Sequence, residues 1–256
     1  MKLTFEVPSL DQVLETTLWT QEEGVAPFWR DKLYQEYPQL DQKKALALSE
    51  SARKAYVRDI LSQLYLDLKD ELKKKAEIWQ KTWQQKLPQI ERALSVAYET
   101  EIVDLLNEMR AYPNLNPVCP RYLDSKTFYI FYNIDNDRAI RTCLHEIMHF
   151  LWFYKWQEYF HDDSAEYDVP HLKWIFSEMV QDTMTQNTPL KSLFDGKTNA
   201  YDYFYNMMIE EHPILETLAH FYRNGGLRGL FEDGYAYCKN HESELRAKIK
   251  QAESEK

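Results

Sequence analysis

The chain has 256 residues and a formal net charge of −10 at pH 7. A chain of this length can bury a sizeable core in one large domain or two small ones, and its acidic balance argues against the phosphate backbone of a nucleic acid as a partner. It contains only 6 glycines, against roughly 7% of residues on average, which favours long helices joined by few tight turns.

Residues 1–115 show mainly helical patterns. Ser9 is a suitable N-cap for a first short helix. From 41 to 87 the pattern is helical and heavily charged, with apolar residues at steps of three and four. Pro88 is expected to break or kink this helix, and a second helix over 90–109 then completes an antiparallel helical hairpin. The hairpin could be a propeptide, a wall of a cleft, or an arm that binds a protein partner.

The loop before residue 120 marks a change in character. It leads into Lys126–Ile134, a stretch rich in aromatic and β-branched residues and bounded by polar turn residues, which predicts a β-strand. We therefore place a domain boundary at this loop. The predicted domains are residues 1–115 and 116–256, in a mainly α protein with a small β-sheet.

The most specific motif is His145-Glu146-Ile-Met-His149, an HExxH sequence inside an apolar helical segment. On a helix, residues i and i+4 lie on the same face about one turn apart, so both histidines can bind one metal ion. Glu146 can hold a water molecule without binding the metal, which is the arrangement of a zinc-dependent peptidase. Apart from Glu146, the residues around the histidines are uncharged, so the helix is expected to be buried. They are Thr142, Cys143, Leu144, Ile147, Met148, Phe150 and Leu151. The alternative is a pair of core histidines hydrogen-bonded to the backbone.

A catalytic zinc usually takes three protein ligands and one water, so a third ligand must follow the motif. Glu158 lies on the same predicted helix as the histidines and cannot fold back to them, and residues 162–168 are typical of a solvated connector. Glu178 and Asp182 stand one turn apart on a later predicted helix. We predict that Glu178 binds the metal and that Asp182 orients a ligand histidine, the alternative being a solvated acidic edge of that helix. The acidic candidates considered are Glu158, Asp162, Asp163, Glu166, Asp168, Glu178 and Asp182.

HExxH followed on a second helix by Glu178-x-x-x-Asp182 resembles the gluzincins, the thermolysin-like clan of zinc peptidases. The resemblance covers about residues 140–183. The 28 residues between the motif and Glu178 are nearer to the spacing in the helical oligopeptidases of the clan than to that in thermolysin. The resemblance implies a zincin-like catalytic core that holds Zn²⁺ through His145, His149 and Glu178 and acts on peptides.

The same resemblance implies two further parts of an active site. Enzymes of this clan bind substrate as an added strand at a sheet edge, so Lys126–Ile134 could be such an edge; otherwise it is an ordinary core strand. They also place a Tyr or His that donates to the oxyanion of the tetrahedral intermediate. We choose Tyr235, because it follows the glycine-containing stretch 225–234. The candidates are Tyr167, His171, His220, Tyr235 and Tyr237.

The N-terminus and the cysteines indicate a compartment. The first residues lack the apolar run of a secretion signal, and no stretch approaches the length of a membrane span. Cys119, Cys143 and Cys238 are scattered without paired spacing, which is typical of thiols in a reducing compartment. These features predict a cytoplasmic protein with no membrane partner.

The sequence therefore predicts a zinc metallopeptidase that cleaves peptides or oligopeptides. Glu146 takes a proton from the attacking water and passes it to the leaving amine. Two other functions remain open. One is a zinc hydrolase with a non-peptide substrate, and the other is a non-catalytic helical interaction protein with a structural or vestigial metal site.

Overall fold

The computed structural model describes residues 1–102, 106–162 and 164–254. It is mostly helical with a small sheet, which confirms the predicted class, a mainly α protein with a small β-sheet. The chain divides into two compact units. The first consists of Lys2–Gln85 and Leu106–Cys143, and the second of Met1, Lys86–Leu105 and Leu144–Lys256.

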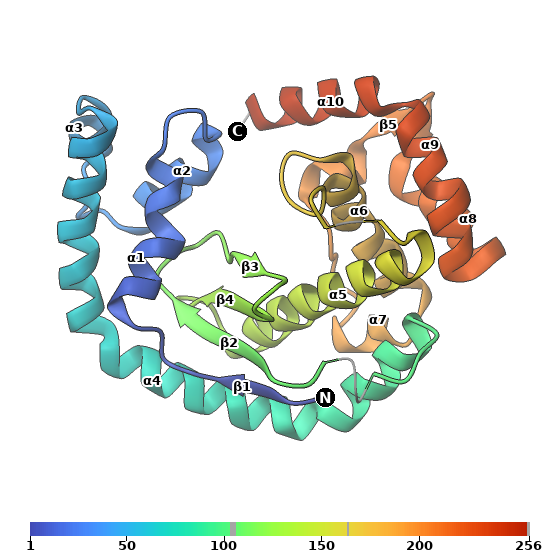
Figure 1. Ribbon diagram of the computed structural model, residues 1–256, viewed down its shortest axis with the longest axis horizontal. Coiled ribbons are helices and arrows are strands. Elements are labelled where there is room, and N and C mark those ends of the chain that lie inside the picture. Colours follow the sequence, from blue (N-terminus) through green and yellow to red (C-terminus); the bar gives the residue numbers. More distant parts are fainter. Residues whose placement is uncertain (103–105, 163, 255–256) are drawn as a thin grey trace. The chain divides into compact units, whose positions relative to one another are not determined.

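The first unit contains a four-stranded sheet (Figure 1) formed by β1 (Leu3–Phe5), β2 (Met109–Asn114), β3 (Arg121–Tyr122) and β4 (Thr127–Phe131). The strand order is β1-β2-β4-β3. β1 pairs with β2 and β2 with β4 in parallel, whereas β3 is antiparallel to β4. Strands from residues 1–115 and from residues 116–256 both belong to this sheet, so the predicted domain boundary falls within it.

The predicted strand Lys126–Ile134 corresponds to β4, which lies inside the sheet. β2 pairs along one side of it, and Arg121 and Tyr122 of β3 pair on the other side. Beyond β3, the backbone N–H of Tyr129 donates to the carbonyl oxygen of Pro120 at 2.9 Å. The expectation of an exposed substrate edge at this strand is therefore wrong, and the alternative of a core strand is confirmed.

The helical hairpin predicted around Pro88 is not formed. Pro88 lies inside one continuous helix, α4 (Glu50–Ala97). A proline in a helix interior removes one backbone hydrogen bond and costs roughly 3 kcal/mol or more. Trp83 before it and Ile90 after it are both buried, so packing on both sides of the proline offsets this cost and keeps the helix continuous.

The second predicted helix, over residues 90–109, is also different from the expectation. Its helical part ends with α4 at Ala97, and Met109 is the first residue of β2. Residues 103–105 of this stretch lie outside the described residues. Met109 pairs with Leu3 of β1, and the following residue pairs with β4. Non-local strand pairing therefore overrides the helical spacing of apolar residues near residue 109.

The helices of the first unit enclose an apolar core. The first of them is capped as predicted, because the Ser9 hydroxyl accepts from the Gln12 N–H at 3.2 Å and the Gln12 side chain accepts from the Ser9 N–H at 2.8 Å. Val13, Leu33 and Leu61 are among the fully buried members of the core. The helices before α4 are α1 (Leu10–Leu18), η1 (Trp19–Gln21), α2 (Pro27–Glu36) and α3 (Gln42–Leu46).

The second unit contains most of α5 (Asn136–Phe160) and the elements that follow it. Two helices come next, α6 (Leu172–Asn187) and the short α7 (Leu190–Leu193). A small hairpin with its preceding turn and a C-terminal helical run complete the unit. Their elements are η2 (Asp202–Asn206), β5 (Met208–Ile209), β6 (His212–Pro213), α8 (Ile214–Gly229), the π-helical turn η3 (Leu230–Gly234), α9 (Tyr235–Asn240) and α10 (Glu242–Ser254).

Helix α6 is the most deeply buried helix around the candidate site. It packs against α8 and α9 (Figure 1). Its Phe176 meets Trp152 of α5 with ring centroids 5.6 Å apart. Every residue from Ile175 to Thr185 is buried. The predicted alternative, a solvated acidic edge on this helix, is therefore wrong.

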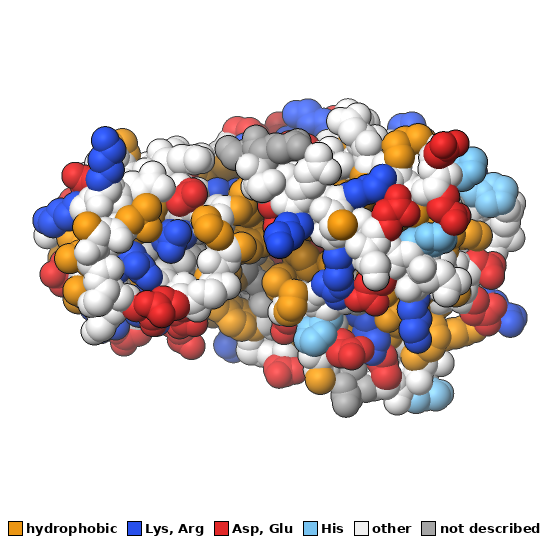
Figure 2. Space-filling view, turned by 90° about the horizontal axis from the view of Figure 1, so that it is seen from above, with side chains coloured by type: hydrophobic (Ala, Val, Ile, Leu, Met, Phe, Trp, Pro, Cys, Tyr) orange, Lys and Arg blue, Asp and Glu red, His pale blue; other side chains and the backbone are white. Residues whose placement is uncertain are grey.

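Charged side chains are mixed on the surface, and the helices can be compared with the length of a membrane span. On the face shown in Figure 2, acidic and basic side chains are interspersed, and Lys and Arg do not gather in one patch. Within the described residues, no helix combines the length and apolar character needed to cross a membrane.

Candidate metal centre

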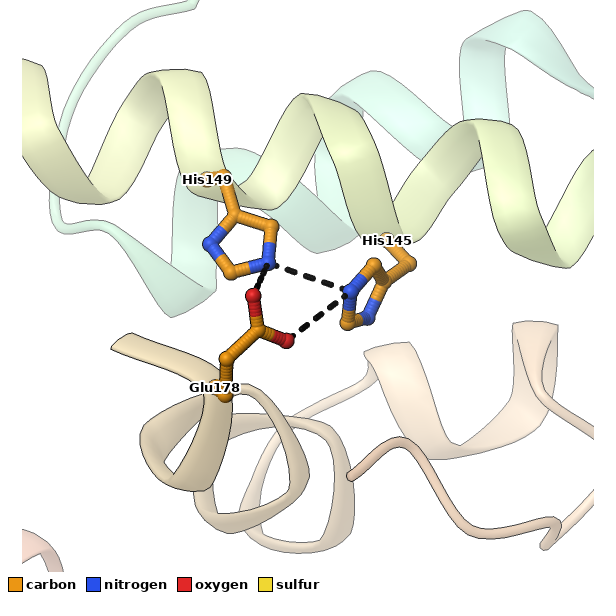
Figure 3. Close-up of side chains that lie close together, drawn as sticks. All are labelled: His145, His149 and Glu178. Carbon is orange, nitrogen blue, oxygen red and sulfur yellow. Dashed lines mark hydrogen bonds and ion pairs between the residues drawn. The ribbon is translucent and has the colours of Figure 1, made fainter. Parts of the chain in front are cut away.

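His145, His149 and Glu178 converge in the second unit. The two histidines stand one turn apart on α5, and Glu178 points toward them from α6 (Figure 3). The two Nε2 atoms are 3.1 Å apart. Glu178 Oε2 lies 3.5 Å from His145 Nε2, and its Oε1 lies 3.4 Å from His149 Nε2. Among the described residues, this is the one group of three or more His, Cys, Asp or Glu side chains placed to hold a metal ion.

The spacing of these atoms fits a tetrahedral zinc ion. Zinc binds imidazole nitrogen and carboxylate oxygen at about 2.0–2.2 Å, which separates neighbouring ligand atoms of a tetrahedron by about 3.3–3.6 Å. The two Nε2 atoms are 3.1 Å apart, slightly closer than this, and each lies 3.4 or 3.5 Å from a different oxygen of the Glu178 carboxylate. With one ligand atom from each residue, all three atoms lie within 4.8 Å of one another. Three protein ligands leave the fourth tetrahedral position for water or substrate, as in catalytic zinc sites.

The other ring nitrogens face protein groups. His145 Nδ1 lies 2.9 Å from Asn199 Oδ1. His149 Nδ1 lies 3.2 Å from Ser177 Oγ and 3.3 Å from Gln181 Nε2. Ligand histidines in metal sites almost always use their second nitrogen in this way. Nε2 is therefore the nitrogen that each ring turns toward Glu178.

The cluster is mostly removed from water. His149 is fully buried and Glu178 is 3% exposed, whereas 21% of the His145 side-chain surface is exposed. A buried carboxylate is costly unless it is paired with positive charge. Burial lowers the pKa of His145, while its hydrogen bond with Glu178 raises it, and the balance lies above the ordinary value. The site thus attracts a cation, either a proton on the ring or a metal ion.

Glu146 lies beside the cluster. It follows His145 on α5 and is buried, with 5% of its surface exposed. Its negative charge also raises the pKa of His145, which places the carboxylate within electrostatic range of the ring. The structure therefore brings the three candidate ligands together and keeps Glu146 buried next to His145 on α5.

Asp182 is linked to His145 through another residue. The sequence predicts that Asp182 orients a ligand histidine directly, but its Oδ1 instead accepts from the backbone N–H of Asn199 at 2.9 Å and from Gln186 Nε2 at 3.3 Å. The Asn199 side chain then contacts His145. Asn199 was not identified from the sequence, because it lies in a loop 54 residues from His145 and no helical spacing relates the two.

Tyr235 belongs to an aromatic cluster. Its ring packs on Trp156 at 4.7 Å and on Phe176 at 5.5 Å. Trp156 follows His149 by seven residues, which is about 10 Å along a helix. Tyr235 thus contacts α5 beyond the histidines and α6 two residues before Glu178. Its predicted role in binding the oxyanion stays a prediction.

The other oxyanion candidates are bonded to other groups or exposed. Tyr167 donates to Asp162 Oδ1 at 2.7 Å, and Tyr237 donates to the carbonyl oxygen of Ile209 at 3.2 Å. His171 is exposed at the start of α6. His220 Nε2 lies 2.9 Å from Asn224 Nδ2.

Tyr203 is a tyrosine that sequence reasoning did not include and whose pKa responds to the charge of Glu178. Burial first, and then the negative charges of Glu253 and Glu178, raise the pKa of Tyr203. Its hydroxyl thus stays protonated, can donate a hydrogen bond, and lies within electrostatic range of the Glu178 carboxylate.

The remaining acidic candidates are bonded elsewhere or exposed. Asp162 accepts from Trp156 Nε1 at 2.9 Å and from Lys173 at 2.5 Å, and these hydrogen bonds, opposed by burial, lower its pKa. Glu166 pairs with Lys173 at 2.8 Å. Glu158 and Asp168 are exposed, and Asp163 lies outside the described residues.

No protein-family model, no curated protein and no solved structure matches the chain. The function has to be inferred from the site.

Proposed function

We propose that the protein is a zinc-dependent peptidase in which His145, His149 and Glu178 bind the zinc. The observation on which this depends is the convergence of two imidazole nitrogens and a carboxylate, from two helices, within 3.1 to 3.5 Å. Three ligands of this kind with one open position are typical of catalytic zinc. The same donor set also suits iron(II). Glu146 in the HExxH sequence favours zinc, because that motif joins a zinc site to a general base.

When bound, a zinc ion in this position supplies an electrophile that lowers the pKa of a coordinated water and polarises the substrate carbonyl. His145 and His149 bind through neutral nitrogens, and Glu178 contributes the negative charge. Glu146 accepts the proton of the attacking water and then donates it to the nitrogen of the leaving amine. A general base of this kind contributes roughly 10²–10⁴ in rate.

Peptides or oligopeptides are the proposed substrates. The support is the resemblance of residues 140–183 to the gluzincins, together with the burial of Glu178, which a solvated acidic residue would lack. The cytoplasm is the proposed compartment, because no disulfide joins Cys119, Cys143 and Cys238. The helices of residues 1–97 could also bind a protein partner.

The first test is the metal content of protein purified without added metal. Elemental analysis of the wild type should give one zinc per chain, and His149→Ala should lose it. His212→Ala is the matched control, because His212 is exposed and lies on the short strand β6. Iron in place of zinc, or a wild type that neither contains nor takes up zinc tightly, would overturn the proposal.

The second test separates peptidase action from other zinc chemistry. Digestion of a peptide library by the zinc-loaded wild type should give cleaved products. Glu146→Gln should abolish cleavage and still hold one zinc per chain. Hydrolysis that persists in this variant would remove Glu146 from the mechanism. Zinc binding without any cleavage of peptides would point instead to a non-peptide substrate or a structural site.

A further inference from the structure

We propose that Asn199 is a positioning residue that holds His145 as its Nδ1–H tautomer and so turns the Nε2 lone pair toward His149 and Glu178. Its importance for catalysis rests on the proposed function, whereas the tautomer itself can be measured without metal or substrate.

The amide of Asn199 is held in one orientation. Its Nδ2 lies 2.9 Å from Thr185 Oγ1 and 3.5 Å from the carbonyl oxygen of Gln181. A carbonyl oxygen only accepts hydrogen bonds, so the NH₂ group has to face it. Reversing the amide would place Oδ1 against that carbonyl oxygen, and because Asn199 is buried water would not relieve the repulsion.

The backbone of Asn199 is also fixed. Its N–H lies 2.9 Å from Asp182 Oδ1 and 3.0 Å from the hydroxyl oxygen of Tyr205. Asp182 therefore supports the histidine indirectly, because it holds Asn199 and Asn199 contacts His145. The sequence predicts a direct contact. The side-chain oxygen of Asn199 is left facing His145.

This orientation decides where the proton on His145 lies. Asn199 Oδ1 is an acceptor 2.9 Å from His145 Nδ1, so Nδ1 must carry the hydrogen. In a neutral imidazole the other nitrogen then has only a lone pair. That lone pair is on Nε2, which lies 3.5 Å from Glu178 Oε2 and 3.1 Å from His149 Nε2.

His149 has a similar arrangement behind its ring. Ser177 Oγ donates to the carbonyl oxygen of Trp174 at 2.7 Å and is left to accept from His149 Nδ1, 3.2 Å away. Gln181 Oε1 is buried with no hydrogen-bond partner, while its Nε2 lies 3.3 Å from the same ring nitrogen. A half-turn of this amide brings the oxygen to Nδ1–H and satisfies both groups. Both rings thus present lone pairs to the position of the ion.

The direct test is the tautomer of His145 in metal-free protein. Nitrogen NMR of histidine-labelled protein, at a pH above the pKa of the ring, distinguishes Nδ1–H from Nε2–H, and the signal is assigned by its absence in His145→Gln. We expect the Nδ1–H form. An Nε2–H form in the wild type would overturn the proposal, whether or not the protein proves to be a peptidase.

Variants of Asn199 test the same point through zinc affinity. Asn199→Leu has a similar volume and no acceptor, so it should lose the tautomer preference and bind zinc about 10–100 times more weakly. Asn199→Asp keeps an acceptor at Nδ1, so it should retain the Nδ1–H tautomer and bind zinc more tightly than Asn199→Leu. Its second oxygen replaces the NH₂ group that faces the carbonyl oxygen of Gln181, so its stability should be lower than that of the wild type. Asn224→Leu is the matched control, because it breaks the exposed Asn–His contact with His220, and it should change neither property.

The outcomes separate this inference from the proposed function. Weakened zinc binding in Asn199→Leu, with rescue in Asn199→Asp, supports the positioning role. Unchanged tautomer and affinity in Asn199→Leu would overturn it even if the enzyme is active. If Asn199→Leu does not fold, the wild-type tautomer and the affinity of Asn199→Asp still decide. If the protein binds no zinc but His145 has the Nδ1–H tautomer, the proposed peptidase function would be refuted and the positioning of the ring by Asn199 would be supported.

Discussion

Zinc should stabilise the folded protein, because the three proposed ligands join α5 to the buried helix α6. A ligand that binds only the native state adds RT ln(1 + [L]/Kd) to the free energy of unfolding, which is about 4 kcal/mol at a free zinc concentration roughly 1,000 times Kd. For a domain of roughly 150–250 residues, each kcal/mol shifts Tm by about 2–4 °C. The expected rise in Tm is then about 8–16 °C.

The dependence on concentration is more informative than a single shift. Each tenfold increase in free zinc above Kd should add about 1.4 kcal/mol, or about 3–6 °C in Tm. Calorimetry in buffers of defined free zinc measures this slope. His149→Ala also creates a cavity, because the ring is fully buried, so its Tm should be lower at every zinc concentration. Its slope should nevertheless be close to zero.

The slope of Tm against free zinc concentration is compared between variants. His212→Ala, at an exposed position, should keep the wild-type slope. A zero slope in the wild type would show that no native-state zinc site exists. Equal slopes in the wild type and His149→Ala would show that zinc binds elsewhere, and the ligand assignment would be refuted.

Three further predictions concern single residues of the site. Glu178→Ala should lower zinc affinity more than about 100-fold, which exceeds the usual effect of losing a residue that hydrogen-bonds to a ligand. Glu166→Ala should not change the affinity. The reverse result would make Glu166 the third ligand. Tyr203→Phe should lower kcat about 10²–10³-fold if its hydroxyl binds the oxyanion, and its zinc content should be unchanged. A comparable loss in Tyr235→Phe alone would show that Tyr235, as predicted from the sequence, binds the oxyanion. Burial lowers the pKa of His145 and its hydrogen bond with Glu178 raises it, and the resulting pKa lies above the ordinary value. Protonated His145 therefore stabilises the metal-free fold at low pH, and this stability is lost as pH rises through the raised pKa. Because the proton competes with zinc for the ring, zinc affinity measured by titration should fall as pH drops through the same range, and an affinity independent of pH would exclude His145 as a ligand.

The sequence predicts the group of His145, His149 and Glu178 that lies together in the structure, and the histidine pair depends on a local relation. His145 and His149 share a helix face through the i, i+4 spacing alone. Glu178 could be chosen because it is an acidic residue on a helix with an apolar face, and the structure brings it to the histidines. Asn199 could not be found in this way, since its position depends on the path of a loop 54 residues further along the chain.

The errors in the fold have the same origin. Pro88 is a strong local signal for a break, but buried residues on both sides of it keep α4 continuous. Near Met109 the apolar spacing favours a helix, yet this residue pairs with a strand from the first residues of the chain. β4 has the composition of a strand, and composition does not reveal whether a second strand will cover its outer side. In each case a contact distant in sequence decides the outcome.

Helix α6 carries an argument for the site that is independent of the HExxH motif. A helix buried on all sides is normally apolar all round, yet α6 has buried polar side chains that are costly without partners. Those partners lie at the candidate metal centre: Ser177 and Glu178 reach the histidines, and Asp182 and Thr185 hold Asn199. The same helix thus provides the third ligand and the groups that orient both rings. A purely structural helix in this position would be more stable with apolar residues there, so the polar face of α6 supports the proposed metal site.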